Sequence, residues 1–115
     1  SRDNGETWSA ARDTDIPNPG SSLEVIVLRD GRWLIVYNDS TKSRDNLSIA
    51  ISEDEGKTWP LKRRLEPQSD GSTSFSYPSV IQSADGAVHI TYTCKGPRGG
   101  RIRHGILQPG QLKTD

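Results

Sequence analysis

The chain has 115 residues with a low hydrophobic content of 30%, so we expect a piece of a larger protein. Its 15 Lys and Arg residues balance 15 Asp and Glu residues, which argues against a nucleic-acid partner or an anionic membrane surface. No apolar run is long enough for a membrane span, and no basic-then-apolar signal sequence is present.

Metal-binding side chains are scarce. Cys94 is the only cysteine, and His89 and His104 are the only histidines. The sequence therefore excludes an internal disulfide and a cysteine-based zinc site, and it argues against a histidine-rich metal site.

The chain opens with the pattern S-x-D-x-G-x-T-W, which occupies residues 1–8 and recurs at residues 52–59. A second landmark also repeats. Asp30-Gly31 precedes "RWLIVY" and Asp85-Gly86 precedes "AVHITY", each ending in a tyrosine seven residues after the aspartate. Two landmarks in the same order indicate a repeat of roughly fifty residues, which is typical of a propeller blade.

The segments between these landmarks favour short strands. They are rich in Val, Ile, Thr and Tyr and are bounded by Asp-Gly, Pro and Gly-Gly turns: 22–28, 32–38, 47–52, 79–82, 87–93 and 102–107. The two Asp-Gly pairs predict hairpins, because glycine supplies the positive φ of a tight turn. We therefore predict an all-β chain whose blades have four antiparallel strands.

The repeated box has the composition of a self-bonded turn. Its glycine permits the turn, its aspartate and hydroxyls can bond the turn's own backbone, and its tryptophan is expected to pack on the sheet. The box resembles the Asp-box of the sialidase and neuraminidase superfamily. That resemblance implies a place between the third and fourth strands of a blade, remote from the active site. A structural role is therefore expected for Asp3, Trp8, Asp54 and Trp59.

The resemblance extends along the chain. "SRDNLSIAISEDEGKTW" (43–59) resembles the sialidase segment with the third of three arginines that grip the substrate carboxylate, which implies that role for Arg44. "YPSVIQSADGAVHITYT" (77–93) resembles the segment of the catalytic tyrosine, which implies that role for Tyr77. Asn38 and Asp39 end a strand on the side of the Arg44 loop and are candidate substrate-binding residues.

The implied chemistry is coherent. A sialic acid carries its carboxylate on the anomeric carbon, so a neutral phenol avoids the repulsion that a carboxylate nucleophile would meet. A guanidinium offers paired donors that fit the substrate carboxylate. This reaction requires no cofactor or metal. The resemblance also implies a sialoside or other glycan as substrate and favours a secreted or periplasmic location.

Half of the family's site lies outside this sequence. In the family, earlier blades supply the other two arginines, the general acid and the glutamate that activates the tyrosine. The carboxylates available here, Glu24, Asp39 and Asp45, match none of these positions. Pro78 after Tyr77 and the nearby Phe75 are typical of the broader group of sialidase-like BNR-repeat proteins.

The expected architecture is the C-terminal part of a six-bladed β-propeller. Residues 1–12 would end one blade, 13–66 would form a full blade, and 67–115 would supply three strands of the last blade and a tail. The missing blades are thus an expected partner. A non-catalytic carbohydrate-binding propeller and a protein-interaction module remain alternatives, in which Arg44 is a solvated loop residue and Tyr77 an ordinary packing residue.

Overall fold

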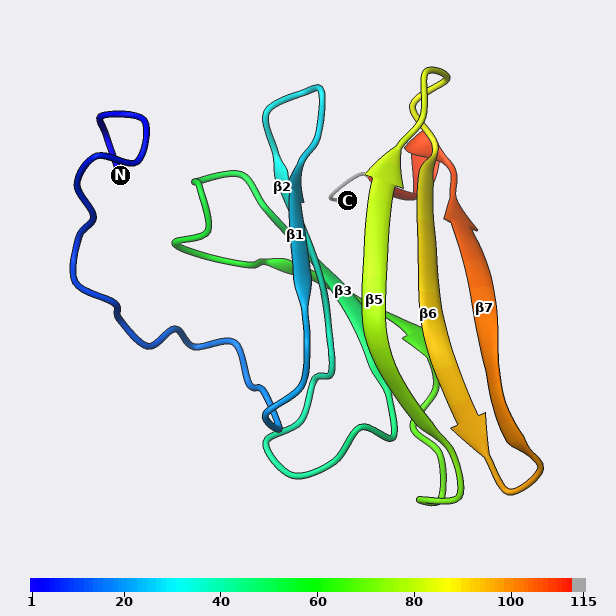
Figure 1. The fold of residues 1–115 in the computed structure, drawn as a ribbon. Coiled ribbons are helices and arrows are strands. Elements are labelled where there is room, and N and C mark those ends of the chain that lie inside the picture. Colours follow the sequence, from blue (N-terminus) through cyan, green and yellow to red (C-terminus); the bar gives the residue numbers. More distant parts are fainter. Residues whose placement is uncertain (113–115) are drawn as a thin grey trace.

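The structure is a computed structural model that describes residues 1–112. Seven strands form two antiparallel sheets (Figure 1). The first sheet has the order β1-β2-β3-β4, with strands Glu24–Val27, Trp33–Tyr37, Leu47–Ser52 and Leu61–Glu66. The second has the order β5-β6-β7, with strands Ser74–Gln82, Val88–Gly96 and Gly99–Leu107. A short 3-10 helix, Pro109–Leu112, follows. The all-β prediction is confirmed.

The core lies between the two sheets. Apolar residues alternate along β6, so one face of this strand is buried while the other faces outward. β2 and β3 are buried on both faces, because Ile16 and Trp59 cover the face that the second sheet does not reach. The side chains between the sheets include Leu34, Val36, Ile49, Ile51, Val80, Val88, Ile90 and Tyr92. Each such aliphatic side chain contributes about 1.5–3 kcal/mol by burial.

Both predicted Asp-Gly hairpins are present, and their turns have the same backbone pattern. The Gly31 N–H donates to the Leu28 carbonyl, and the Gly86 N–H donates to the Ser83 carbonyl. The two glycines have φ values of 88° and 89°, which L-residues adopt only with strain. The turns therefore fix the register of β1 with β2 and of β5 with β6.

Two strands differ from the sequence-based expectation. β4 has the sequence LKRRLE, whose exposed charged centre carries no apolar alternation, and it was not among the predicted strands. β5 begins at Ser74 rather than at residue 79, and it runs through Pro78. Proline is tolerated there because β5 is an edge strand with a bulge between Ser76 and Ser79.

Polar contacts also join the two sheets. The Tyr92 hydroxyl donates to the Glu66 carboxylate at 2.5 Å, and Arg103 forms an ion pair with the same carboxylate. The Glu24 carboxylate accepts the Val80 N–H at 2.9 Å. Arg29 donates to the Ala84 carbonyl at 2.7 Å. These contacts tie both ends of the second sheet to the first.

Residues 1–15 are exposed and contain no strand, and Figure 1 shows this blue segment leading away from the sheets. Among the described residues, no helix is long and apolar enough to cross a membrane.

Candidate functional site

The two boxes fold into the same turn. In the second box, the Thr58 N–H donates to the Asp54 carboxylate at 2.8 Å and the Thr58 hydroxyl donates to it at 2.7 Å. The Ser52 hydroxyl donates to the same carboxylate and accepts the Gly56 N–H. Ser1, Asp3, Gly5 and Thr7 repeat each of these bonds in the first box. The repeated residues therefore encode a local structure rather than a reactive centre.

These hydrogen bonds stabilise the charged carboxylates. The bonds from Thr7 to Asp3 and from Thr58 to Asp54 are the main cause that lowers the pKa of each aspartate to about 2. Both carboxylates accept hydrogen bonds from their own turn and are held in the charged form, which suits a structural role rather than that of a catalytic acid.

The surroundings of the two tryptophans differ. Trp59 packs against Ile35, Tyr37 and Ala50 on the first sheet, as predicted. Trp8 does not pack on a sheet: it is 77% exposed and donates only to the Gly5 carbonyl of its own box. The prediction for Trp8 is wrong in this chain, because no strand of the described residues lies beside the first box.

Arg44 lies in the loop that joins β2 to β3. Its guanidinium donates to the Gly20 carbonyl at 3.0 Å, and its own carbonyl accepts the Phe75 N–H at 2.7 Å. The residue is half-buried, and Gly20 is the one described partner of its guanidinium, so other donors of this group remain for a ligand. The 17–23 loop and β5 together position this arginine.

Asn38 is a structural crosslink in this fold. It is fully buried, and its amide donates to the carbonyls of Asn46 and Phe75 at 2.6 and 3.1 Å. Its side-chain oxygen accepts the Ser21 hydroxyl. The side chain is thus occupied by the protein itself and does not reach the surface, which differs from the predicted contact with a substrate.

Asp39 is half-buried beside this crosslink. Its N–H donates to the Asn46 side chain at 2.9 Å. Burial, followed by the negative charge of Asp39, raises the pKa of Tyr37 to about 12. Asp39 lies two residues after the last residue of β2, and its side chain is partly exposed.

Tyr77 is 65% exposed and has an unusual backbone. It lies within the β5 bulge with a φ of 52°, in the left-handed region that disfavours residues other than glycine. Its hydroxyl makes no hydrogen bond with the residues that the structure describes. Bulges of this kind re-aim side chains and are common beside active sites.

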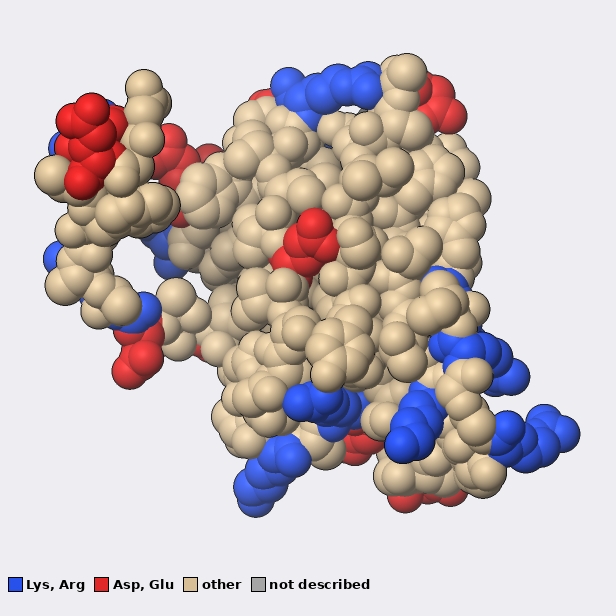
Figure 2. Space-filling view, in the orientation of Figure 1, with Lys and Arg blue, Asp and Glu red and all other residues tan. Residues whose placement is uncertain are grey.

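Arg44 and Tyr77 lie toward one end of the molecule, opposite the second box. Arg44 precedes β3 and the box follows it, and six residues of strand separate them by about 20 Å. The Arg44 carbonyl bonds Phe75, two residues before Tyr77. The loops at this end are at the bottom of Figure 1, and Figure 2 shows Lys and Arg side chains gathered there.

Sequence reasoning missed the 17–23 loop. Gly20 and Ser21 hold Arg44 and Asn38, but the sequence "PNPGSS" signals only a turn. Within residues 1–112, no group of three His, Cys, Asp or Glu side chains is arranged as metal ligands.

Residues 1–90 match the BNR repeat-like domain family. A protein named sialidase from Paraclostridium sordellii is 24% identical over 110 residues, which cover 92% of this chain and 26% of the relative. The chain thus spans about a quarter of the length of that relative. No solved structure matches the chain.

Proposed function

The chain belongs to the BNR repeat-like domain family, and from this premise we propose that it supplies half of the active site of a sialidase-like glycoside hydrolase. In this proposal Arg44 binds the carboxylate of a terminal sialic acid or similar anionic sugar. Tyr77 is the nucleophile. The acid, the other carboxylate-binding arginines and the base that activates the tyrosine come from the remainder of the parent protein.

The observation that carries the proposal is the presentation of Tyr77. Its side chain is exposed and free of hydrogen bonds with the described residues, on a bulge that holds a strained φ of 52°. A packing tyrosine needs neither the exposure nor the strain. The backbone bond from Phe75 to Arg44 brings the carboxylate-binding loop beside the same stretch of β5.

The chemistry follows from these two side chains. Arg44 orients the sugar by charge-assisted hydrogen bonds to its carboxylate. The Tyr77 oxygen attacks the anomeric carbon and loses its proton to the base, while the bond to the aglycone breaks and the aglycone oxygen takes a proton from the acid. Water then forms a bond to the anomeric carbon and gives a proton to the former acid. The tyrosyl–sugar bond breaks, the Tyr77 oxygen regains its proton from the base, and the product keeps its anomeric configuration.

Asn38 and Asp39 have different roles in this proposal. Asn38 acts as a positioning residue, because its amide joins the Arg44 loop to β5 through the carbonyls of Asn46 and Phe75. Asp39 is the remaining candidate for direct contact with a sugar hydroxyl.

Hydrolysis of fluorogenic glycosides by the parent protein, with sialosides first, tests this function. Tyr77→Phe is expected to lower kcat by at least about 10³-fold while binding persists, since only the nucleophilic oxygen is removed. Arg44→Ala is expected to raise KM for anionic sugars. The matched control is Tyr37→Phe, because Tyr37 is fully buried and its hydroxyl cannot contact a substrate.

Full activity in the Tyr77→Phe variant would exclude Tyr77 as the nucleophile. If the parent cleaves no glycoside but still binds glycans through Arg44, the function is recognition rather than catalysis. If Arg44→Ala affects no sugar ligand, the protein-interaction alternative is favoured.

A further inference from the structure

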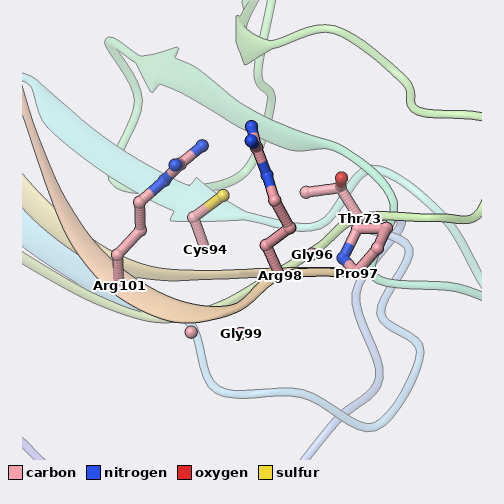
Figure 3. A pocket seen from close by; sticks show the side chains of 8 residues that line it. Thr73, Cys94, Gly96, Pro97, Arg98, Gly99 and Arg101 are labelled. Carbon is pink, nitrogen blue, oxygen red and sulfur yellow. The ribbon is translucent and has the colours of Figure 1, made fainter.

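A hollow of about 410 Å³ lies beside the hairpin that joins β6 and β7. Its lining consists of Thr73, Cys94, Gly96 and the turn residues 97–101, and it includes no Asp or Glu. In Figure 3 the side chains of Arg98 and Arg101 extend to the same side of the hairpin as those of Cys94 and Thr73. The hollow therefore has two positive charges and a hydroxyl on one side.

These two arginines are not needed to hold the fold. Both are exposed, and neither guanidinium forms a hydrogen bond or an ion pair with the described residues. Arg103, two residues further along β7, differs because it is paired with Glu66. The guanidinium groups of Arg98 and Arg101 keep their donors for a ligand, and two such groups on one side of the hairpin match the oxygens of a carboxylate or sulfate.

The hollow adjoins the proposed site. Thr73 in its lining lies two residues before Phe75, whose N–H bonds the Arg44 carbonyl. Phe75 also pairs with Cys94, which lines the hollow from β6. The lower end of Figure 2, where basic side chains gather, includes this region.

We propose that the Arg98–Arg101 hollow is a second anion subsite, which binds a sulfate ester or carboxylate on an inner sugar of the same glycan. This inference rests on the proposed function, because Arg44 would hold the terminal anionic sugar. The volume suits one sugar unit, since pockets for small ligands span roughly 300–1,000 Å³. The end of the molecule that holds both sites would then bind glycans with two negative charges more tightly than glycans with one.

Calorimetric binding to the full parent protein in the Tyr77→Phe background tests the subsite without turnover. Three probes share one oligosaccharide with a terminal sialic acid: the inner sugar is neutral, sulfated, or replaced by a uronic acid. The sulfated and uronic-acid probes separate the two anion sources. We expect at least one of them to bind 10-fold or more tightly than the neutral-core probe.

The double variant Arg98→Gln/Arg101→Gln is expected to abolish this preference, so that all three probes bind with equal affinity. Arg64→Gln is the matched control, because Arg64 is an exposed arginine on β4 outside the hollow. It is expected to keep the preference. Neither variant removes an interaction within the described chain, and circular dichroism verifies the fold.

Two results would overturn the subsite. One is equal affinity for all three probes in the Tyr77→Phe protein. The other is a loss of preference in Arg64→Gln as large as in the double variant, which would reveal general charge attraction. A sulfated inner disaccharide without the terminal sugar separates the two proposals, because its binding depends on Arg98 and Arg101 even if the parent does not recognise sialosides.

Discussion

At the scale of single residues, the two boxes place one hydrogen-bond network in two different surroundings. Asp54 belongs to a turn between β3 and β4, whose Trp59 packs on the first sheet. Asp3 makes the same bonds in the exposed N-terminal segment. A comparison of Asp54 with Asp3 therefore distinguishes the strength of the hydrogen bonds within the turn from their effect on the stability of the fold.

The low pKa of Asp54 predicts an acid-dependent loss of stability. The folded-state pKa of about 2 lies below the ordinary value of 3.8, so the ionised network stabilises the fold above about pH 4. That contribution is lost as the pH falls from about 4 to about 2. The test is urea unfolding of this chain between pH 5 and pH 2. Asp54→Asn is expected to lower the free energy of unfolding at pH 5 and to weaken its dependence on pH.

Asp3→Asn is the matched control for this experiment. Its carboxylate has the same pKa of about 2, but its box packs on neither sheet. Global unfolding of the chain should therefore be unchanged in this variant. An equal effect of both substitutions would show that the first box also packs in solution.

Asn38 provides a second prediction at the residue scale. Asn38→Ala removes the donor that satisfies the buried carbonyls of Asn46 and Phe75. Since each unsatisfied buried group costs about 1–3 kcal/mol, we expect a loss of roughly 2–4 kcal/mol in the free energy of unfolding. Asn18→Ala is the control, because Asn18 bonds only Ser21 within its own loop. Equal losses in the two variants would contradict the crosslinking role.

At the scale of elements, glycines in tight turns differ in what surrounds them. Gly31 and Gly56 both have positive φ, at 88° and 82°. A Cβ on Gly31 would meet nothing within 4 Å, whereas one on Gly56 would lie 3.3 Å from the Trp33 ring. The β1–β2 turn thus requires glycine for its backbone alone, and the second box requires it for both backbone and packing.

Substitution of each glycine by alanine measures the free-energy cost of the backbone strain and of the contact with the Trp33 ring. Gly31→Ala is expected to destabilise the chain by about 1–2 kcal/mol through backbone strain. Gly56→Ala is expected to cost about 1 kcal/mol more, because the Trp33 ring must move as well. Chemical unfolding of both variants supplies the comparison. A smaller loss in Gly56→Ala than in Gly31→Ala would show that the Trp33 contact is unimportant.

At the scale of the whole molecule, both outer faces expose large apolar side chains. Leu23, Val25 and Val27 are exposed on or beside β1, and Ile81, Ile102 and Ile106 are exposed on the second sheet. Sheets with two apolar faces and open edge strands tend to associate. Further blades of the parent are the partners that the proposed propeller would supply.

We therefore predict that the isolated 115-residue chain is marginally stable or self-associates. Light scattering after size exclusion, at several concentrations, is the direct measurement. A monodisperse monomer with a steep, cooperative unfolding transition would contradict this prediction. In the proposed propeller, co-expression with the other blades is expected to give a single soluble species.

The sequence by itself determined the features that depend on neighbouring residues. The two boxes, the Asp-Gly hairpins and most of the strands were predictable. The hydrogen bonds of a turn and the apolar alternation of a strand depend on residues that are close together in the sequence. β4 was not predictable, since its partner strand, rather than its own charged sequence, keeps it extended. The start of β5 at Ser74 likewise depends on pairing with β6.

Tertiary structure alone decided which candidate side chains face solvent. The sequence placed Asn38 and Tyr77 in the same candidate site, but packing buries the first and the β5 bulge exposes the second. Residues distant in sequence hold Arg44, and the hollow beside Arg98 and Arg101 forms only where the 67–73 loop meets the β6–β7 hairpin. Burial and pocket shape arise from contacts between distant segments, and a linear pattern does not record them.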